Sequence, residues 1–293
     1  MAREIAAPGR TKEILEHHGF SFKKSLGQNF LIDRNILEKI VLASKAGSED
    51  GVVEIGPGIG GLTEHFAKAA KQVEAFEIDG RLLPVLQETM APYPNVRIWN
   101  EDILNVDMRR VLSEDLQDVQ EVIVTGNLPY YVTTPIIMNL LEQRLPITRM
   151  VFMMQKEVAE RIAAEPGSKN YGSLSIAAQY FAEPVKTMIV PKTVFVPKPN
   201  VDSAVVRFEI RDTPPVQVED EAFFFRVIKS AFAQRRKTLW NNLQHNLTGR
   251  EQREELGAAL QEAGIDSGRR GETLTMQEFA RLSDSIQHRL HQR

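Results

Sequence analysis

The sequence predicts an α/β protein in which a doubly wound, largely parallel sheet is followed by a smaller, all-helical C-terminal domain. Strand-forming runs alternate with helix-length segments between residues 52 and 210, the pattern of a parallel sheet with crossover helices. Strand patterns end near Pro214-Pro215, and only helical periodicity follows. A glycine-rich turn at residues 56–61 joins the first strand of the series to its helix, at the edge where such sheets bind ligands.

Hydrophobic periodicity predicts the individual elements. We expect seven strands, at residues 52–55, 73–78, 96–99, 122–125, 150–154, 185–190 and 204–210, the last two as an antiparallel hairpin. We expect helices at residues 11–19, 33–46, 62–71, 81–89, 157–164, 173–181, 221–232, 238–246, 251–263 and 276–285. Asp33 is the expected N-cap of the second helix. The predicted domains are residues 1–212, with an N-terminal helical segment over 1–50, and residues 213–293.

The composition narrows the chemistry. The 293 residues carry a net charge of −3 and include no cysteine, which excludes disulfides, cysteine-ligated metals and a thiolate nucleophile. The six histidines lie outside every glycine-rich or aromatic motif, so we expect neither a metal site nor an imidazole base. No apolar run is long enough to span a bilayer, and no secretory signal is recognisable, which favours a cytoplasmic protein. Without a heptad pattern, a monomer is expected.

The glycine-rich turn predicts a nucleoside-binding site. Gly56, Gly58 and Gly61 fit the G-x-G-x-x-G pattern, and Glu77 follows 21 residues after Gly56, where a carboxylate accepts both ribose hydroxyls. Asp102 follows the third strand, where it can accept a hydrogen bond from an adenine amino group. Two alternatives remain: glycines that serve only close packing, and an Asp102 that only caps a turn. Nicotinamide, flavin and S-adenosylmethionine all suit the pattern.

The stretch Asn127-Leu128-Pro129-Tyr130 follows the fourth strand and reaches the same edge of the sheet. The Asn127 side-chain oxygen and the Leu128 carbonyl can accept two hydrogen bonds from an exocyclic amine, and the Tyr130 ring can cover one face of a base. Accepting both N–H bonds would localise the lone pair of adenine N6, so that attack on a methyl sulfonium needs mainly positioning. The alternative is an ordinary turn, because Asn and Pro are common turn formers.

Several motifs together identify a family. They are Lys24-Ser25-Leu26-Gly27-Gln28-Asn29-Phe30-Leu31, Glu54-Ile55-Gly56-Pro57-Gly58, Glu77-Ile78-Asp79, Asn127-Leu128-Pro129-Tyr130, Met154-Gln155-Lys156-Glu157-Val158-Ala159, Phe195-Val196-Pro197-Lys198-Pro199-Asn200-Val201-Asp202-Ser203 and Phe232-Ala233-Gln234-Arg235-Arg236-Lys237-Thr238-Leu239. In this order they resemble the ribosomal RNA adenine N6-dimethyltransferase family, and within it the bacterial small-subunit branch. The resemblance covers nearly the whole chain. It implies a Rossmann-like, S-adenosylmethionine-dependent methyltransferase sheet.

The resemblance also implies roles for residues at the cofactor. S-adenosylmethionine would be the methyl donor, with Asn29 and Leu31 closing over it. The Gly56 and Gly58 backbone would approach its amino-acid end. The roles expected from the pattern itself, ribose for Glu77 and adenine for Asp102, agree with those of the family. Asn127 would border the cofactor as well as the target base.

At the target base, the resemblance implies a clamp of Asn127, Leu128 and Tyr130, with Phe195 as a second aromatic face and Phe30 helping to line the pocket. The alternative for Phe195 is a core aromatic before a proline-rich loop. Family members dimethylate two adjacent adenosines in the hairpin loop near the 3′ end of 16S rRNA, so the expected partner is that RNA or the assembling 30S subunit. The helical domain would orient the enzyme there. Candidate phosphate contacts are Lys23, Lys24, Lys156, Arg161, Lys198, Arg235, Arg236 and Lys237.

Three other functions remain as alternatives. The resistance branch of the family methylates a large-subunit rRNA adenine, and the motifs at residues 195–203 and 232–239 favour the small-subunit branch instead. A non-catalytic RNA-binding assembly factor would be expected to have lost Asn127, Tyr130 or Glu77, and all three are present. A nicotinamide oxidoreductase has no evident use for the Asn127 clamp.

Overall fold

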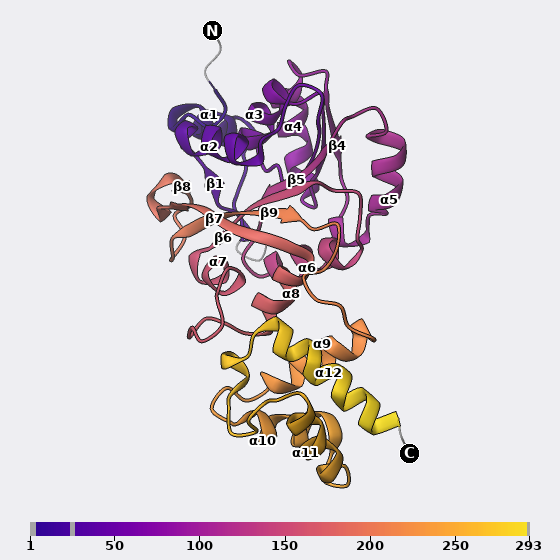
Figure 1. Ribbon diagram of the computed structural model, residues 1–293. Helices are drawn as coiled ribbons and strands as arrows, with labels where there is room; N and C mark the ends of the chain where they lie inside the picture. Colours follow the sequence, from indigo (N-terminus) through magenta and orange to yellow (C-terminus); the bar gives the residue numbers. More distant parts are fainter. Residues whose placement is uncertain (1–3, 24–26, 292–293) are drawn as a thin grey trace. The chain divides into compact units, whose positions relative to one another are not determined.

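The computed structural model describes residues 4–23 and 27–291, which form two compact units (Figure 1). The first comprises Met1–Ala159 and Ala182–Ile210, and the second comprises Glu160–Phe181 and Arg211–Arg293. The second unit therefore resumes next to the predicted boundary at residue 212. It also contains residues 160–181, which the sequence analysis placed in the first domain. That the units act as a catalytic and an RNA-orienting domain stays a prediction.

Side chains of α8 (Ser173–Phe181) explain why this helix belongs to the second unit. The Tyr180 hydroxyl donates to Glu221 at 2.9 Å, and its ring lies 5.5 Å from that of Phe224, both on α9 (Glu221–Ala231). Aromatic packing of this kind depends on a residue 44 positions away along the chain. Helical periodicity alone could therefore not assign α8 to its partners.

The first unit contains a seven-stranded sheet in the order β4-β3-β2-β5-β6-β9-β7. The strands are β2 (Gly51–Ile55), β3 (Gln72–Phe76), β4 (Val96–Trp99), β5 (Val122–Asn127), β6 (Arg149–Gln155), β7 (Ala182–Val190) and β9 (Ser203–Ile210). β2 to β6 are parallel, while β9 is antiparallel to both β6 and β7. All seven predicted strands and the predicted antiparallel hairpin are confirmed.

The strand order reverses between the neighbouring strands β2 and β5. From β2 the order continues through β3 and β4 to one edge of the sheet, and from β5 it continues through β6 and β9 to β7 at the other edge. Right-handed crossovers then place α3 (Gly61–Ala69) and α6 (Thr133–Glu142) on opposite faces. At such a switch point, the loops after two neighbouring strands diverge and leave a crevice beyond their carboxyl ends. The loops after β2 and β5 carry the glycine-rich turn and the Asn127 motif, so both reach this crevice.

Helix α2 (Arg34–Ser44) and α3 cover one face of the sheet, where Leu37 and Phe66 belong to one buried apolar cluster with Val52 and Val151. As predicted, Asp33 caps α2 by accepting from Ile36 N at 3.1 Å. Two arginines of the sheet bind the last carbonyls of α2: Arg149 Nε donates to Ser44 O at 2.9 Å, and Arg207 Nη1 donates to Ala43 O at 3.4 Å. Both ends of α2 are thereby satisfied.

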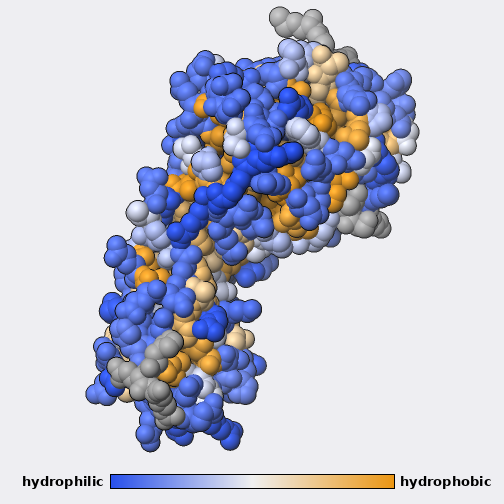
Figure 2. All heavy atoms as spheres, turned by 90° about the vertical axis from the view of Figure 1, so that its right-hand side faces the viewer, coloured by the Kyte–Doolittle hydropathy of each residue, from blue (hydrophilic) through white to orange (hydrophobic). Residues whose placement is uncertain are grey.

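The remaining helices of the first unit are α1 (Pro8–His17), α4 (Leu83–Met90), the short α5 (Met108–Arg110) and the start of α7 (Lys156–Ile162). The second unit adds α10 (Leu239–Leu243), α11 (Arg253–Glu262) and α12 (Met276–His291) around a core that includes Phe224 and Phe279. No helix of the described chain is both long and apolar enough to cross a membrane. On the face shown in Figure 2, hydrophilic residues predominate and apolar ones form smaller patches.

The sequence analysis missed several features, among them the three-residue helix α5. It did not assign α6, which opens Thr133-Thr134-Pro135 and is rich in β-branched residues of low helix propensity, although Pro is tolerated in a first turn. It also missed the two-residue strands β1 (Phe30–Leu31) and β8 (Phe195–Val196), which pair antiparallel. Two residues carry no periodicity, so such a pair cannot be read from one sequence.

Candidate functional site

A cavity of about 280 Å³ lies at the carboxyl ends of β2, β3 and β5, where the crevice was expected. Nine predicted site residues line it: Asn29, Leu31, Gly56, Gly58, Glu77, Asp102, Asn127, Leu128 and Tyr130. They come from five separate stretches of the chain, so the fold brings the predicted cofactor and target residues into one space. Phe195 is not among the described residues that line this cavity.

The turn after β2 needs glycine. Gly56, Gly58 and Gly60 have φ angles of +71°, +63° and +92°, a region that side chains other than glycine rarely adopt. A Cβ on Gly58 would also lie 2.9 Å from Cε1 of Phe30. Any side chain here would strain the backbone and displace the aromatic ring that lines the cavity.

Glu77 follows β3 and is buried at the cavity wall. Its Oε2 accepts from Gly58 N at 3.1 Å, and its Oε1 accepts from Asp79 N at 2.8 Å. Each oxygen keeps a further lone pair for a hydroxyl. Burial, only partly offset by these hydrogen bonds, raises the pKa of Glu77 to about 7.

Glu54 is a cavity residue to which the sequence analysis gave no role of its own. It lies on β2, is 1% exposed, and among the described residues its Oε2 has no hydrogen-bond partner. Burial raises the pKa of this carboxyl to about 8. An orphaned buried acceptor beside a cavity indicates a missing donor. The signal in the sequence is a carboxylate within the otherwise apolar run Val52-Val53-Glu54-Ile55.

Asp102 fits both of its interpretations. Its Oδ1 accepts from Leu104 N at 3.1 Å and so caps the short turn at Ile103–Asn105, yet the residue also lines the cavity. Beside it, the side chains of Ile78 and Leu104 are exposed and line the same space. Two apolar side chains and a carboxylate form a suitable site for a flat, amino-bearing ring.

At the opposite end, side chains from distant segments orient the target clamp. Asn127 Nδ2 donates to Asn29 O at 2.8 Å, which leaves the amide oxygen as an acceptor. The Tyr130 hydroxyl lies 3.0 Å from Ser203 Oγ. Tyr131, which had no assigned role, also lines the cavity and is 60% exposed.

Phe195 lies in the core. It is 3% exposed and belongs to the buried cluster that includes Val190 and Val205. Its pairing with Leu31, between β8 and β1, explains this placement, because the pair closes over the sheet. Its assignment as the second aromatic face of the target base therefore stays a prediction, and it requires the ring to become accessible.

Asp79 ties the segment before β1 to the cavity wall. It accepts from Gln28 Nε2 at 2.7 Å and forms a bidentate pair with Arg81, at 2.9 Å to Oδ1 and 2.6 Å to Oδ2. Arg81 in turn donates to Ser21 O at 3.0 Å and covers the Phe20 ring. The Arg81 hydrogen bonds hold the pKa of Asp79 below its usual value.

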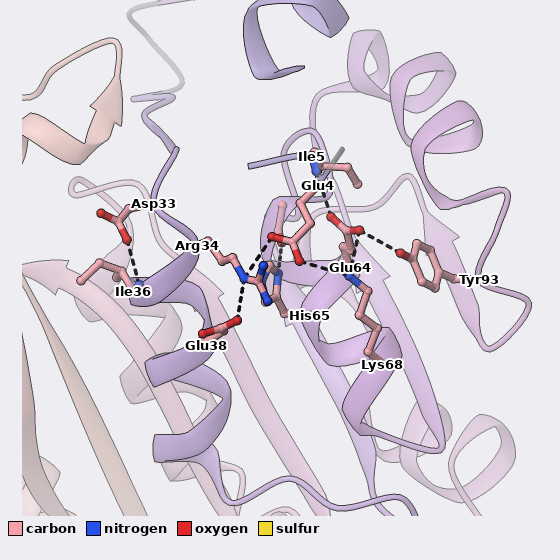
Figure 3. Close-up of polar contacts among 11 residues, drawn as sticks. Glu4, Ile5, Asp33, Arg34, Ile36, Glu38, Glu64, His65, Lys68 and Tyr93 are labelled. Carbon is pink, nitrogen blue, oxygen red and sulfur yellow. Dashed lines mark hydrogen bonds and ion pairs between the residues drawn. The ribbon is translucent and has the colours of Figure 1, made fainter. Parts of the chain in front are cut away.

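A second polar cluster fixes the N-terminal segment to α3 (Figure 3). Glu64, in the first turn of this helix, accepts from Ile5 N at 2.9 Å, Tyr93 Oη at 2.8 Å and Lys68 Nζ at 3.0 Å. Because α3 directly follows the glycine-rich turn, these bonds support the wall of the cavity from outside.

Most of the predicted phosphate contacts are exposed: Lys23, Arg161, Lys198, Arg235, Arg236 and Lys237. Lys156 is half-buried, and Lys24 lies outside the described residues. Arg235 is engaged within its own unit, by Lys169 O and by Glu272. Away from the cavity, His17, His18 and Glu88 bring possible ligand atoms within 4.8 Å of one another, although His18 Nε2 and Glu88 Oε2 already form a hydrogen bond at 2.8 Å.

Comparison with known proteins shows the family of this chain. The family model for ribosomal RNA adenine dimethylases matches residues 19–288. The ribosomal RNA small subunit methyltransferase A of Geobacillus sp. (strain WCH70) is 61% identical over 289 residues, covering 98% of this chain and 99% of that protein. The protein of the same name from Bacillus pumilus (strain SAFR-032) is 58% identical over 291 residues, covering 99% and 100%.

Solved structures agree with the fold. A dimethyladenosine transferase from Plasmodium falciparum superposes with a TM-score of 0.70 at 25% identity, covering 86% of this chain and 95% of that chain. The 23S rRNA methyltransferase ErmE superposes with a TM-score of 0.67 at 25% identity, covering 88% and 99%. The predicted Rossmann-like methyltransferase fold is confirmed.

The cavity fits S-adenosylmethionine by its own chemistry. The orphaned Glu54 oxygen suits an ammonium group, Glu77 has lone pairs for ribose hydroxyls, and Asp102 lies beside apolar side chains suited to adenine. S-adenosylmethionine is accordingly the cofactor, as the sequence predicted. The protein is an rRNA adenine dimethyltransferase, and the chain belongs to the ribosomal RNA adenine dimethylase family.

Proposed function

We propose that this enzyme dimethylates N6 of two adjacent adenosines in the 3′-terminal hairpin loop of 16S rRNA, during small-subunit biogenesis. The observation that carries the proposal is the Asn127 amide. Its nitrogen is committed to the Asn29 carbonyl, so its oxygen is the group left to accept a hydrogen bond at the cavity. Full-length relatives named for the small subunit support the choice of RNA.

Residues of the protein bind the cofactor and orient it. Glu77 accepts the ribose hydroxyls of the cofactor, Asp102 accepts from its adenine, and Asn29 and Leu31 cover it. The Gly56 and Gly58 backbone approaches its amino-acid end, where Glu54 accepts from the ammonium group. When bound, S-adenosylmethionine supplies a methyl group on a positively charged sulfur.

At the target base, the Asn127 oxygen and the Leu128 carbonyl accept the two N6–H bonds. These acceptors withdraw the N6 lone pair from the ring system and aim it at the methyl group. The Tyr130 ring covers one face of the base. Phe195, which lies in the core, covers the other face after its ring becomes accessible. An adenosine in a loop enters the cavity at a lower cost than a paired one.

The partner in this proposal is 16S rRNA within the assembling 30S subunit, met in the cytoplasm by a monomeric enzyme. The exposed basic residues at 235–237 of the helical unit, together with Lys23 and Lys198, contact phosphates. The helical unit orients the enzyme on its substrate. Each of the two rounds of transfer needs a fresh cofactor and releases one N6 proton to solvent, and the clamp forms no covalent bond with the base. In the second round the methylated N6 offers one remaining N–H bond to the clamp.

Methylation of separated ribosomal subunits tests the proposal. With labelled S-adenosylmethionine and small and large subunits that lack these modifications, we expect label in 16S rRNA alone. The second candidate is a 23S rRNA adenine methyltransferase, which the superposition on ErmE favours. Label confined to 23S rRNA would establish that candidate, and absence of label in both would leave a non-catalytic assembly factor.

A further inference from the structure

One hydrogen bond joins the target end of the cavity to the start of β9, which is separated from β5 by β6 in the sheet. The Tyr130 hydroxyl lies 3.0 Å from Ser203 Oγ, and the two residues are 73 positions apart in the chain. Tyr130 belongs to the irregular segment after β5, where no backbone ladder fixes it. Its ring lines the cavity and is half-buried.

Ser203 is, by contrast, held on both sides. As the first residue of β9 it pairs with Gln155 of β6 and with Val190 of β7, and it is 1% exposed. The residue before it is also fixed, because Asp202 accepts from Lys192 N at 3.0 Å through its side chain. The Ser203 hydroxyl is therefore a fixed point of the sheet that faces an aromatic side chain of an irregular segment.

A tyrosine ring attached only at its Cβ can take several staggered χ1 positions. A hydrogen bond at the far end of the ring selects the one in which the hydroxyl reaches its partner. We propose that Ser203 is a positioning residue for methyl transfer: its hydroxyl holds the Tyr130 ring in the orientation that receives the target adenine. The inference rests on the proposed function, in which Tyr130 covers one face of that base.

Asn127, the other member of the clamp, is oriented in the same way. The Asn29 carbonyl fixes the Asn127 amide from 98 residues away, so both members of the clamp are oriented by groups outside their own segment. A buried serine with a purely structural role would satisfy its hydroxyl on backbone groups, as Ser44 does by donating to Val41 O at 2.6 Å. Ser203 instead meets a side chain that lines the cavity.

A double-mutant cycle tests the inference. Ser203→Ala, Tyr130→Phe and the double variant are compared in single-turnover methylation of small subunits at saturating cofactor. Each single substitution removes the same bond from one end, so we expect each to slow transfer about two- to tenfold, the range of one neutral hydrogen bond. The double variant should be no slower than either single one, and cofactor affinity should stay unchanged.

Ser44→Ala is the matched control, because it also removes a buried serine hydroxyl but lies at the end of α2 and does not line the cavity. We expect it to lower the melting temperature without slowing transfer. Tyr130→Phe keeps the inference testable should Ser203→Ala fail to fold.

Two outcomes would overturn the inference: a normal rate in Ser203→Ala, or slowing in the double variant that equals the product of the single effects. Tyr130→Ala separates the positioning role of Ser203 from the proposed function, in which Tyr130 covers the target base. Strong loss in Tyr130→Ala with a normal Ser203→Ala removes only the role of Ser203. Normal transfer in Tyr130→Ala removes the proposed role of Tyr130, and with it the inference.

Discussion

The two ends of the cavity are built in different ways. At the cofactor end, the glycine-rich turn, Glu77 and Asp102 follow successive strands, and their geometry is set by backbone conformation and by partners 2 to 19 positions away. At the target end, Asn127 and Tyr130 are oriented by residues 98 and 73 positions distant. The cofactor end is thus formed by the loops after neighbouring strands, whereas the orientation of Asn127 and Tyr130 depends on contacts with segments much farther away along the chain.

This difference separates the functions of the two ends. A cofactor that is bound anew for every methyl group suits a site that is preformed by backbone. A target base that enters from RNA needs acceptors held at one angle to one atom, since small misplacements reduce the rate of transfer strongly. Substitutions at the two ends should therefore affect different quantities.

The largest effect is expected for Asn127→Ala. Loss of the amide acceptor should lower the turnover number about 100-fold or more, comparable to removal of one oxyanion-hole donor in other enzymes. Cofactor affinity should change little, because Glu77, Asp102 and the glycine turn remain. Turnover is measured on small subunits, and affinity by calorimetry. A folded variant that no longer binds cofactor would show that Asn127 has a different role.

Glu77→Ala should show the reverse pattern. Removing two ribose hydrogen bonds to a charged group should weaken cofactor binding about 10- to 100-fold, with a smaller effect on turnover at saturating cofactor. The sign of the pH dependence follows from the pKa of Glu77, which burial raises to about 7. Below that pH the free protein holds a protonated carboxyl, which must lose its proton to accept two hydroxyls.

Cofactor affinity should therefore fall as the pH decreases from about 8 to about 6. In Glu77→Gln, the part of this dependence centred near pH 7 should disappear. Titrations of both proteins across this range measure it. An unchanged profile in Glu77→Gln would assign the titration to another group, of which Glu54 is the nearest candidate, because burial raises its pKa to about 8.

A smaller effect is expected for Asp79→Asn. The substitution weakens the charge-assisted bonds from Arg81 and Gln28 that hold the segment before β1, so cofactor should bind about tenfold more weakly and dissociate faster. Glu38→Gln is the control, since it removes an equally short but exposed pair with Arg34 on α2. Equal effects of both variants in stopped-flow dissociation would argue against a role for Asp79 at the cavity.

The smallest effect is expected for Phe195→Leu, which keeps an apolar side chain and loses the aromatic face. If the ring stacks on the target base, turnover falls about fivefold, within the range for loss of one base–aromatic stack. Cofactor affinity should not change. A lower melting temperature with normal turnover would show that Phe195 serves only the core in which it lies.

The sequence placed the glycine-rich turn, Glu77 and Asp102 at one edge of the sheet, because they follow strands that are visible as periodicity, and the structure brings them to one cavity. It missed Glu54, whose role depends on being buried without a partner. At the target end it named Asn127 and Tyr130 but not what orients them, since the contacts with Asn29 and Ser203 exist only once the sheet has formed. The burial of Phe195 follows from a two-residue strand pair that leaves no periodic signal.

The most direct test of the account is the identity of the modified atom. Small-subunit RNA treated with the enzyme and S-adenosylmethionine is digested to nucleosides, and the products are separated and weighed by mass spectrometry beside standards. Because the proposed clamp accepts hydrogen bonds from an exocyclic amine, through the Asn127 oxygen and the Leu128 carbonyl, we expect the product to be N6,N6-dimethyladenosine. It should map to two adjacent adenosines. A product methylated at a ring atom of adenine, or on another base, would contradict the assignment of the clamp.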